Sequence, residues 1–246
     1  MFLLVVCLLG SQISAKTNTK HSPLLLGEGV GVRAKQTTHK TCYHTLMFFI
    51  ALSSSRGTTF QAILDRIADG SLTMKCLGLV TDRSDRGCID KAKAANIPVS
   101  IVERVSGESK EDYERKLNRA IDELRDNVPS DDVLLAAVGW MWILSPNFTK
   151  AWRIINVHPA LLPKYGGKGM YGHHVHDAVL ASGDKESGVS IHLMDHGVDT
   201  GKILLQKTCP VLPDDTPETL QARVQELEKE WYPRVLQMIE RGEMKL

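Results

Sequence analysis

Short apolar runs alternate along this chain with stretches that have the period of an amphipathic helix. Between the runs, apolar side chains recur every three or four residues, as they do at Phe60, Ile63, Leu64 and Ile67. Strands that alternate with helices form βαβ units. The sequence therefore predicts an α/β fold, in which a mostly parallel, twisted sheet carries helices on both faces. Buried parallel strands are expected at residues 46–52, 76–81, 98–102, 133–138, 154–157 and 189–194, and a last strand is expected at residues 202–208.

Two longer segments predict further helices. Residues 113–124 place their apolar side chains on one face, and residues 216–239 form a longer amphipathic pattern. The second helix is expected to begin with Asp215 or Thr216 as its cap, because Pro217 is suited to a first helical turn.

Charge and cysteine content restrict the class of protein. The 30 Lys and Arg residues nearly balance the 29 Asp and Glu residues, which argues against nucleic acid or a membrane surface as a partner. No apolar run approaches the roughly 20 residues that span a bilayer. We expect a cytoplasmic protein with neither a disulfide framework nor a cysteine zinc site, because its cysteines are scattered and form no C-x-x-C motif. They are Cys7, Cys42, Cys76, Cys88 and Cys209.

Residues 1–45 differ from the rest of the chain. They show no helical or strand period, and their first ten residues resemble the apolar part of a signal peptide without a preceding Lys or Arg. We expect a disordered or spurious N-terminal extension, followed by a single domain over residues 46–246. Met47 lies at the start of the first expected strand and is a natural alternative start.

The loop after the first expected strand is a candidate phosphate site. Residues 53–59 read Ser-Ser-Ser-Arg-Gly-Thr-Thr and open the next helix, whose N-terminus favours anions. The loop is neither a Walker A motif nor a G-x-G-x-x-G fingerprint. A hydroxyl-rich turn that only caps the helix remains the alternative interpretation. The candidate phosphate-binding residues are Arg56, Gly57, Thr58 and Thr59.

The loop after the fourth expected strand is rich in large apolar side chains. Two tryptophans and a methionine at the carboxyl end of a strand are suited to form a wall for a flat aromatic ligand. Ordinary core packing is the alternative. The residues concerned are Trp140, Met141, Trp142, Ile143 and Leu144.

Asn156 and His158 form the most informative pair. They are two residues apart on a short strand, so both side chains point to the same face. An amide and an imidazole that converge at a strand end can hydrogen-bond one developing oxyanion. A buried Asn–His pair with only a structural role is the alternative.

A carboxylate is expected to approach this pair. Asp199 lies between glycines in the loop after residues 189–194, and Asp195 opens the same loop. A carboxylate near His158 raises its pKa and favours the imidazolium. The alternative is a plain Asp-Gly turn.

Three segments together resemble the folate-dependent formyltransferases. They are NVHPALLPKYGG at 156–167, GVDTG at 197–201 and the Ser/Gly-rich loop at 53–59. The resemblance runs from about Leu46 to Leu246. It implies a Rossmann-like single domain whose catalytic residues are Asn156, His158 and Asp199.

The resemblance also implies binding residues. The phosphate loop corresponds to Arg56, Gly57, Thr58 and Thr59, although Ser55 stands where the family has glycine and Thr59 where it has asparagine. Lys110 stands where the family commonly has a phosphate-binding arginine, and Glu228 matches a glutamate that contacts the sugar of the nucleotide. The wall of the folate pocket corresponds to Met141, Trp142, Ile143 and Leu144, with Trp142 in place of the usual arginine.

The reaction implied by the resemblance is formyl transfer. The amine of glycinamide ribonucleotide attacks the formyl carbon of 10-formyltetrahydrofolate, a co-substrate, in de novo purine (IMP) biosynthesis. Asn156 and protonated His158 stabilise the tetrahedral oxyanion, Asp199 keeps His158 charged and orders a water, and no metal is needed. The enzyme is expected to be a monomer or a homodimer.

Other functions remain open at this point. A methionyl-tRNA formyltransferase shares the Asn-x-His-Pro string, but we expect no C-terminal RNA-binding domain here, and a formyltetrahydrofolate hydrolase needs a larger N-terminal domain. A non-catalytic nucleotide-binding relative would fit the altered phosphate loop. A zinc site is a further alternative, with His173, His174, His176, His192 and His196 as candidate ligands.

Overall fold

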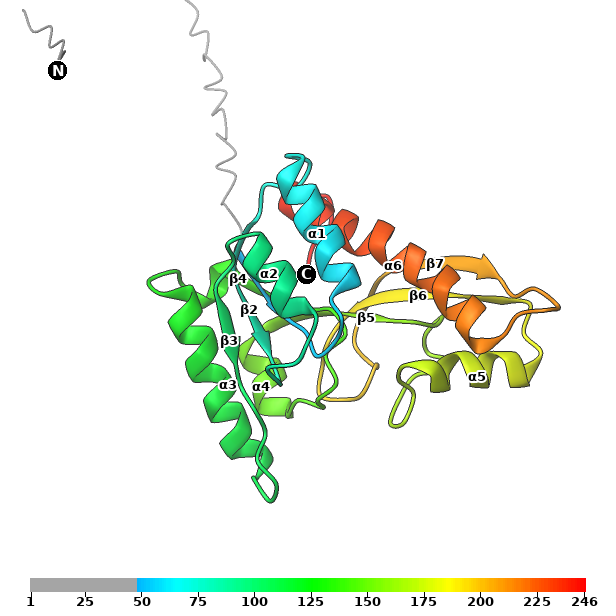
Figure 1. Cartoon of the computed structure of the whole chain (residues 1–246), viewed down its shortest axis with the longest axis horizontal. Helices are drawn as coiled ribbons and strands as arrows, with labels where there is room; N and C mark the ends of the chain where they lie inside the picture. The colour runs from blue at the N-terminus through cyan, green and yellow to red at the C-terminus, as the bar shows by residue number, and fades with distance from the viewer. Residues whose placement is uncertain (1–47) are drawn as a thin grey trace, which may run out of the picture. The chain divides into compact units, whose positions relative to one another are not determined.

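The computed structural model describes residues 48–246, which form one seven-stranded sheet in the order β3-β2-β1-β4-β5-β6-β7 (Figure 1). Neighbouring strands from β3 to β5 are parallel, whereas β6 is antiparallel to β5 and β7 is antiparallel to β6. The expected mostly parallel sheet is confirmed. The strands are β1 Phe48–Leu52, β2 Lys75–Thr81, β3 Val99–Ile101, β4 Val133–Ala137, β5 Arg153–His158, β6 Glu186–Leu193 and β7 Ile203–Pro210.

One expectation about the strands is wrong. Residues 189–194 were expected to be a buried parallel strand, but they belong to the antiparallel strand β6. The expectation failed because β6 is buried along most of its length, and an apolar run of this kind does not reveal strand direction. The N-terminal extension expected at residues 1–45 lies outside the described residues.

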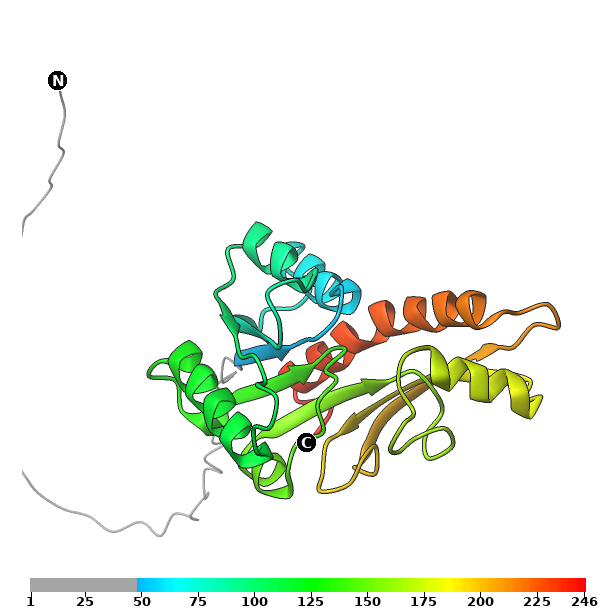
Figure 2. The same cartoon turned by 60° about the horizontal axis from the view of Figure 1, so that its bottom comes forward.

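Helices cover both faces of the sheet, as expected. Along β1, Phe49 and Ala51 pack into the core under α1, α2 and α6, whereas Ile50 and Leu52 pack into the core under α3 and α4. Figure 2 shows α1, α2 and α6 on one side of the sheet and α3 on the other. The helices are α1 Thr58–Ala68, α2 Cys88–Ala94, α3 Lys110–Arg125, α4 Pro146–Ala151, α5 His173–Ser182 and α6 Pro217–Glu240, and a short 3-10 helix spans Ser130–Asp132.

The long C-terminal helix is fixed at its start and against the sheet. Thr216 caps α6, accepting from the Thr219 N–H, and Pro217 is its first residue; of the two expected caps, Thr216 is the one used. The hydroxyl of Tyr232 donates to the carbonyl of Ile155 in β5 at 2.8 Å. This buried bond places one side of α6 directly behind the strand that carries Asn156.

The sheet changes direction between β1 and β4. From β1 the chain proceeds outward to β2 and β3, and it then returns to add β4 and β5 on the other side of β1. The N–H of Ser54 donates to the carbonyl of Gly139 at 2.9 Å, so the loops that follow β1 and β4 lie together. In open α/β sheets, ligands bind in the crevice at this kind of switch point.

Cysteines and membrane-spanning segments can be examined in the described residues. Cys76, Cys88 and Cys209 are buried and free. Between residues 48 and 246, no helix has the length and apolar character needed to span a membrane.

Candidate active site

A cleft of about 630 Å³ opens at the switch point of the sheet. Loops after β1, β4 and β5, the loop between β6 and β7, and one face of α6 form its walls. The expected residues Arg56, Gly57 and Lys110 do not line it. The expected residues that do are Thr58, Thr59, Met141, Trp142, Ile143, Leu144, Asn156, His158, Asp199 and Glu228.

His158 ends β5 with both ring nitrogens facing polar groups. Its Nε2 lies 2.7 Å from the backbone carbonyl of Tyr165. Because a carbonyl only accepts, Nε2 carries the proton of this bond. The other nitrogen, Nδ1, lies 3.5 Å from Oδ2 of Asp199. The hydrogen-bond partner of Nε2 therefore leaves Nδ1 as the nitrogen available for chemistry.

Asn156 faces the same cleft from the middle of β5. Its Nδ2 lies 3.2 Å from Nε2 of His192, which is the residue paired with Asn156 across β6. His192 is almost fully buried, and its Nε2 also lies 3.6 Å from Oδ1 of Asp199. His192 thus joins Asn156 to Asp199.

Asp199 reaches this cluster through the course of the loop between β6 and β7. Because β6 is antiparallel to β5, the loop leaves the sheet beside Ile154, to whose carbonyl the Met194 N–H donates. It must return along roughly four residues of β5, about 13 Å, to meet His158. Asp199 has a φ of 59°, a conformation rare for residues other than glycine, and its Oδ2 accepts from the Gly167 N–H at 3.0 Å.

Asp195 has a different environment from Asp199. Its carboxylate accepts from the Gly197 N–H at 3.0 Å and from the Thr200 hydroxyl at 2.6 Å, so it closes its own loop. The structure thus brings together the three residues expected to be catalytic, Asn156, His158 and Asp199, and directs Asp195 to local contacts.

The electrostatics of His158 correct one expectation. Burial lowers the pKa of His158 more than the Asp199 charge and the Tyr165 carbonyl raise it, so the pKa lies below its usual value. The charge of Asp199 raises the pKa, as expected, but the expected net rise is absent. Sequence spacing does not show that the imidazole is 4% exposed.

Asp199 itself remains ionised at neutral pH. Burial raises the pKa of its carboxyl group, but the interaction with His192, the charge of His158 and the Gly167 N–H outweigh burial and bring the pKa below its usual value. A permanent negative charge therefore faces Nδ1 of His158, so a proton that arrives there is stabilised.

The loop after β1 is shaped by a glycine with positive φ and by serine hydroxyls. Gly57 caps α1 with a φ of 77°, and its N–H donates to Oγ of Ser55 at 3.1 Å. Arg56 points to solvent beside it. Thr58 and Thr59 begin α1 and face the cleft, so this side offers hydroxyls and a helix N-terminus.

A contact between the first and last helices was not expected from the sequence. The Thr59 hydroxyl donates to Oε2 of Glu228 at 3.1 Å, across 169 positions of the chain. Burial raises the pKa of Glu228 to about 7, and the Thr59 bond only partly opposes this. The carboxyl group is therefore poised between its neutral and charged forms at physiological pH.

A buried acid, Asp82, accepts a hydrogen bond from one tryptophan of the aromatic wall. Nε1 of Trp142 donates to Oδ2 of Asp82 at 3.2 Å, and Arg86 makes two hydrogen bonds of 2.9 Å to the same carboxylate. Tyr113 packs on the indole with ring centroids 5.9 Å apart. Asp82 was missed from the sequence, although an acid directly after a buried strand was a usable signal.

Lys110 begins the helix that also carries Tyr113. It is the first residue of α3, one turn before Tyr113, so the two share a helix face. Tyr113 contacts Trp142, so Lys110 shares a helix face with a residue that supports the aromatic wall, and Lys110 itself does not line the cleft.

The five histidines considered as zinc ligands lie in different places. His192 belongs to the catalytic cluster, and His196 is an exposed neighbour of Asp195. His176 lines the cleft, is 1% exposed, and its Nδ1 has no hydrogen-bond partner among the described residues.

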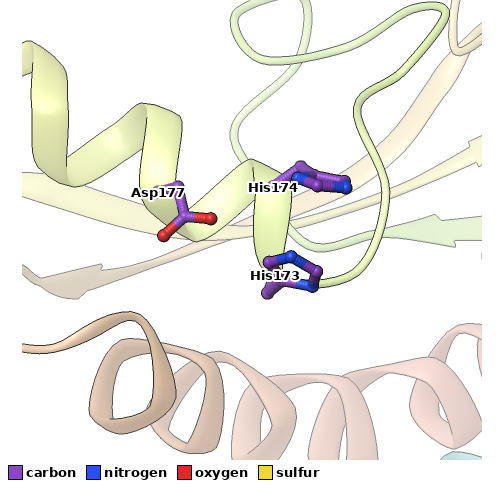
Figure 3. A group of neighbouring side chains, drawn as sticks. All are labelled: His173, His174 and Asp177. Atoms are coloured by element: carbon purple, nitrogen blue, oxygen red, sulfur yellow. The ribbon is translucent and has the colours of Figure 1, made fainter.

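His173 and His174 lie near Asp177 at the start of α5. The potential ligand atoms of these three residues lie within 4.8 Å of one another (Figure 3). All three are exposed and none lines the cleft, so this group is separate from the candidate catalytic residues.

Comparisons with known proteins indicate the family of the chain. The family described as formyl transferase matches residues 47–236. The phosphoribosylglycinamide formyltransferase of Haemophilus influenzae is 32% identical over 79% of this chain and 88% of its own length. The chloroplastic enzyme of that name from Arabidopsis thaliana is 38% identical, over 74% of this chain and 62% of its own length. A trifunctional purine biosynthetic protein of Drosophila melanogaster is 33% identical over 78% of this chain, which spans only 14% of that protein.

Solved structures show the same relationship. The phosphoribosylglycinamide formyltransferase of Coxiella burnetii has a TM-score of 0.71 and 34% identity, over 80% of this chain and 88% of its own. Glycinamide ribonucleotide transformylase 1 of Symbiobacterium toebii has a TM-score of 0.74 and 26% identity, over 82% of this chain and 91% of its own.

Proposed function

The chain belongs to the formyl transferase family, and we propose that it transfers the formyl group of 10-formyltetrahydrofolate to the amine of glycinamide ribonucleotide. This is a step of de novo purine (IMP) biosynthesis. The observation that carries the proposal is the cluster of Asn156, His158 and Asp199 in one cleft, in a chain similar to several enzymes that bear this activity in their names.

The residues of the cleft fit both substrates. Trp140, Met141 and Ile143 form a largely apolar wall that suits the flat pterin ring of the folate, which supplies the formyl group when bound. Thr58 and Thr59, which line the same cleft at the N-terminus of α1, suit a phosphate. The cluster of Asn156, His158 and Asp199 also lines this cleft.

Asn156 and His158 act on the carbonyl oxygen of the group in transfer. The Asn156 amide donates to the oxyanion that develops when the amine attacks, and Nδ1 of His158 donates to it once protonated. Removal of one such donor costs on the order of 100- to 1000-fold in rate. In the free protein the pKa of His158 is lowered by burial, so we propose that the developing negative charge, together with Asp199, favours the protonated ring during the reaction.

Asp199 orients the cluster. Its carboxylate faces both imidazoles, at 3.5 Å from His158 and 3.6 Å from His192. Its negative charge stabilises the protonated ring of His158, and it positions a water that moves a proton from the attacking amine to the leaving nitrogen. These steps need only side chains and water.

The nucleotide side has a defined set of contacts in this proposal. The α1 N-terminus and its threonine hydroxyls bind the phosphate, and Glu228 accepts hydrogen bonds from hydroxyls of the sugar. Residues 46–246 act as the catalytic domain. The cytoplasmic site of action, the lack of a nucleic-acid partner and the state as monomer or homodimer stay predictions.

Formyl transfer can be measured directly on the full chain. With 10-formyldideazafolate and glycinamide ribonucleotide, absorbance should report transfer that requires both substrates. A folded protein that releases no deformylated folate would contradict the proposal. Release without the nucleotide would indicate a hydrolase, and transfer only to methionyl-tRNA would indicate the other formyltransferase.

A further inference from the structure

The backbone of Tyr165 holds the catalytic imidazole. Its carbonyl accepts the bond from Nε2 of His158 at 2.7 Å. Tyr165 has a φ of 59°, in the left-handed region that residues with a side chain rarely adopt. A residue keeps such a conformation only where its surroundings impose it, and such residues concentrate at functional sites.

The side chain of Tyr165 is hydrogen-bonded by residues that do not line the cleft. Its phenol donates to Oδ2 of Asp184 at 2.6 Å and lies beside the hydroxyl of Ser182, the last residue of α5. Asp184 also pairs with Lys164, the neighbour of Tyr165 in the chain. The hydrogen bonds from Lys164 and Tyr165 lower the pKa of Asp184, so it is charged at neutral pH.

We propose that Tyr165, anchored by Asp184, is a positioning residue that fixes the ring orientation and tautomer of His158. The connection runs from the Asp184 carboxylate to the phenol, along the tyrosine to its carbonyl, and from there to Nε2. Neither residue touches the reacting atoms in this arrangement. The inference rests on the proposed function only in assigning the chemistry to His158.

The anchor has a physical consequence for the reaction. While Nε2–H is bound to the carbonyl, Nδ1 is directed at Asp199 and the cleft. The same bond raises the pKa of His158 and so opposes the effect of burial. A loosened anchor therefore reduces both the correct orientation and the protonated fraction of the ring.

The experiment uses Tyr165→Phe, which removes the anchoring bond, and Asp184→Asn, which keeps an acceptor oxygen but removes the charge that strengthens the bond. Both changes keep the shapes of the side chains. The His158 ring is followed by NMR titration in the substrate-free full chain. We expect its pKa to fall in both variants and its two ring nitrogens to show mixed tautomers. We expect kcat to fall by about 10-fold, as for other supporting residues of an active site, with both KM values within about twofold.

Asp177→Asn is the matched control. Asp177 is an exposed carboxylate on the same helix, α5, and it neither lines the cleft nor contacts Tyr165 in any hydrogen bond of the described residues. It should leave the His158 titration and kcat unchanged. The double variant Tyr165→Phe/Asp184→Asn should lose no more than Tyr165→Phe alone, because both changes act on one connection.

A His158 titration that is unchanged in both variants would overturn the inference, whatever the effect on activity. So would an equal change in the Asp177→Asn control. Because the titration needs no substrate, it decides this point even if the wild-type chain transfers no formyl group. If Tyr165→Phe does not fold, Asp184→Asn, whose side chain lies near the surface, provides the same test.

Discussion

The two sides of the cleft are built on different principles. On the catalytic side, four side chains contact one another across neighbouring strands: Asn156, His158, His192 and Asp199. On the proposed nucleotide side, the loop after β1 is shaped by the positive φ of Gly57 and by the hydroxyls of Ser53 and Ser55. The first side depends on contacts among charged and polar side chains, and the second depends on one glycine conformation and on two serines that hold the loop. Substitutions should therefore be tolerated differently on the two sides.

The largest effect should come from Asp199→Asn. The change keeps the size of the side chain but removes the charge that faces Nδ1 of His158. We expect kcat to fall by roughly 100-fold or more, because protonated His158 is no longer stabilised. The pKa of His158, already lowered by burial, should fall further. Steady-state kinetics and histidine NMR titration measure both effects.

Asp195→Asn is the control for this prediction. Asp195 bonds only within its own loop, to Gly197 and Thr200, so kcat should change by only a few-fold. An inactive Asp195 variant beside a nearly normal Asp199 variant would reverse the assignment of the carboxylate and remove the contrast between the two sides.

On the nucleotide side, Gly57→Ala should have the next largest effect. A Cβ at Gly57 would lie 2.8 Å from both Cα and Cβ of Cys88, and φ is 77°. We expect a loss of about 1–3 kcal/mol in unfolding free energy and a raised KM for the nucleotide, with little change in KM for the folate. Thermal unfolding and kinetics with each substrate varied separate these effects.

Gly70→Ala provides a matched comparison, since Gly70 has a φ of 76° and nothing within 4 Å of a Cβ. It carries the same conformational cost without the clash. Its nucleotide KM should be that of the wild type. Equal KM values for the Gly57 and Gly70 variants would mean that the loop after β1 does not shape the nucleotide site.

Glu228→Gln should change the pH dependence of the nucleotide KM more than it changes kcat. The pKa of Glu228 is raised to about 7, so its carboxyl group is neutral below that pH and charged above it. A carboxylate accepts hydrogen bonds from sugar hydroxyls more strongly than a neutral acid does. The nucleotide KM of the wild type should therefore fall a few-fold as the pH rises from 6 to 8, and that of Glu228→Gln should stay flat. An unchanged pH profile in the variant would show that another group is responsible.

The smallest effect is expected for Lys110→Ala. Lys110 is exposed to solvent on part of its surface and shares a helix face with Tyr113, which packs on Trp142. We expect a rise of about two- to threefold in the folate KM, as for a surface charge, with no change in the nucleotide KM. A rise in the nucleotide KM alone would restore the phosphate contact implied by the family resemblance.

Much of the sheet was predictable because its strands are long apolar runs and its main helices have a clear period. Helices α2 and α4 were missed because they have seven and six residues, too few to show a period. Helix α5 was missed because its first turn carries three histidines and follows a glycine. The direction of β6 and β7 depends on pairing partners, which an apolar run does not specify.

The candidate site was predictable to a different extent on each side. The spacing of Asn156 and His158 on one strand correctly predicts that both face one cleft. Sequence spacing alone does not show that Asp199 lies near them, because the position of Asp199 depends on the course of a loop held by Gly167. Only the family resemblance indicated that Asp199 belongs to the cluster. The Thr59–Glu228 bond and the lowered pKa of His158 both arise from tertiary packing, so no local pattern contained them.

The antiparallel arrangement of β5, β6 and β7 also affects how the site assembles. Asn156 and His192 are only 36 positions apart, whereas Thr59 and Glu228 are separated by 169. Contacts between distant positions carry the larger cost of loop closure and form late. We expect amide hydrogen exchange to show that the catalytic cluster stays closed while α6 opens away from α1. In the proposed function a nucleotide contacts both of those helices, so its binding would hold the two ends of the domain together.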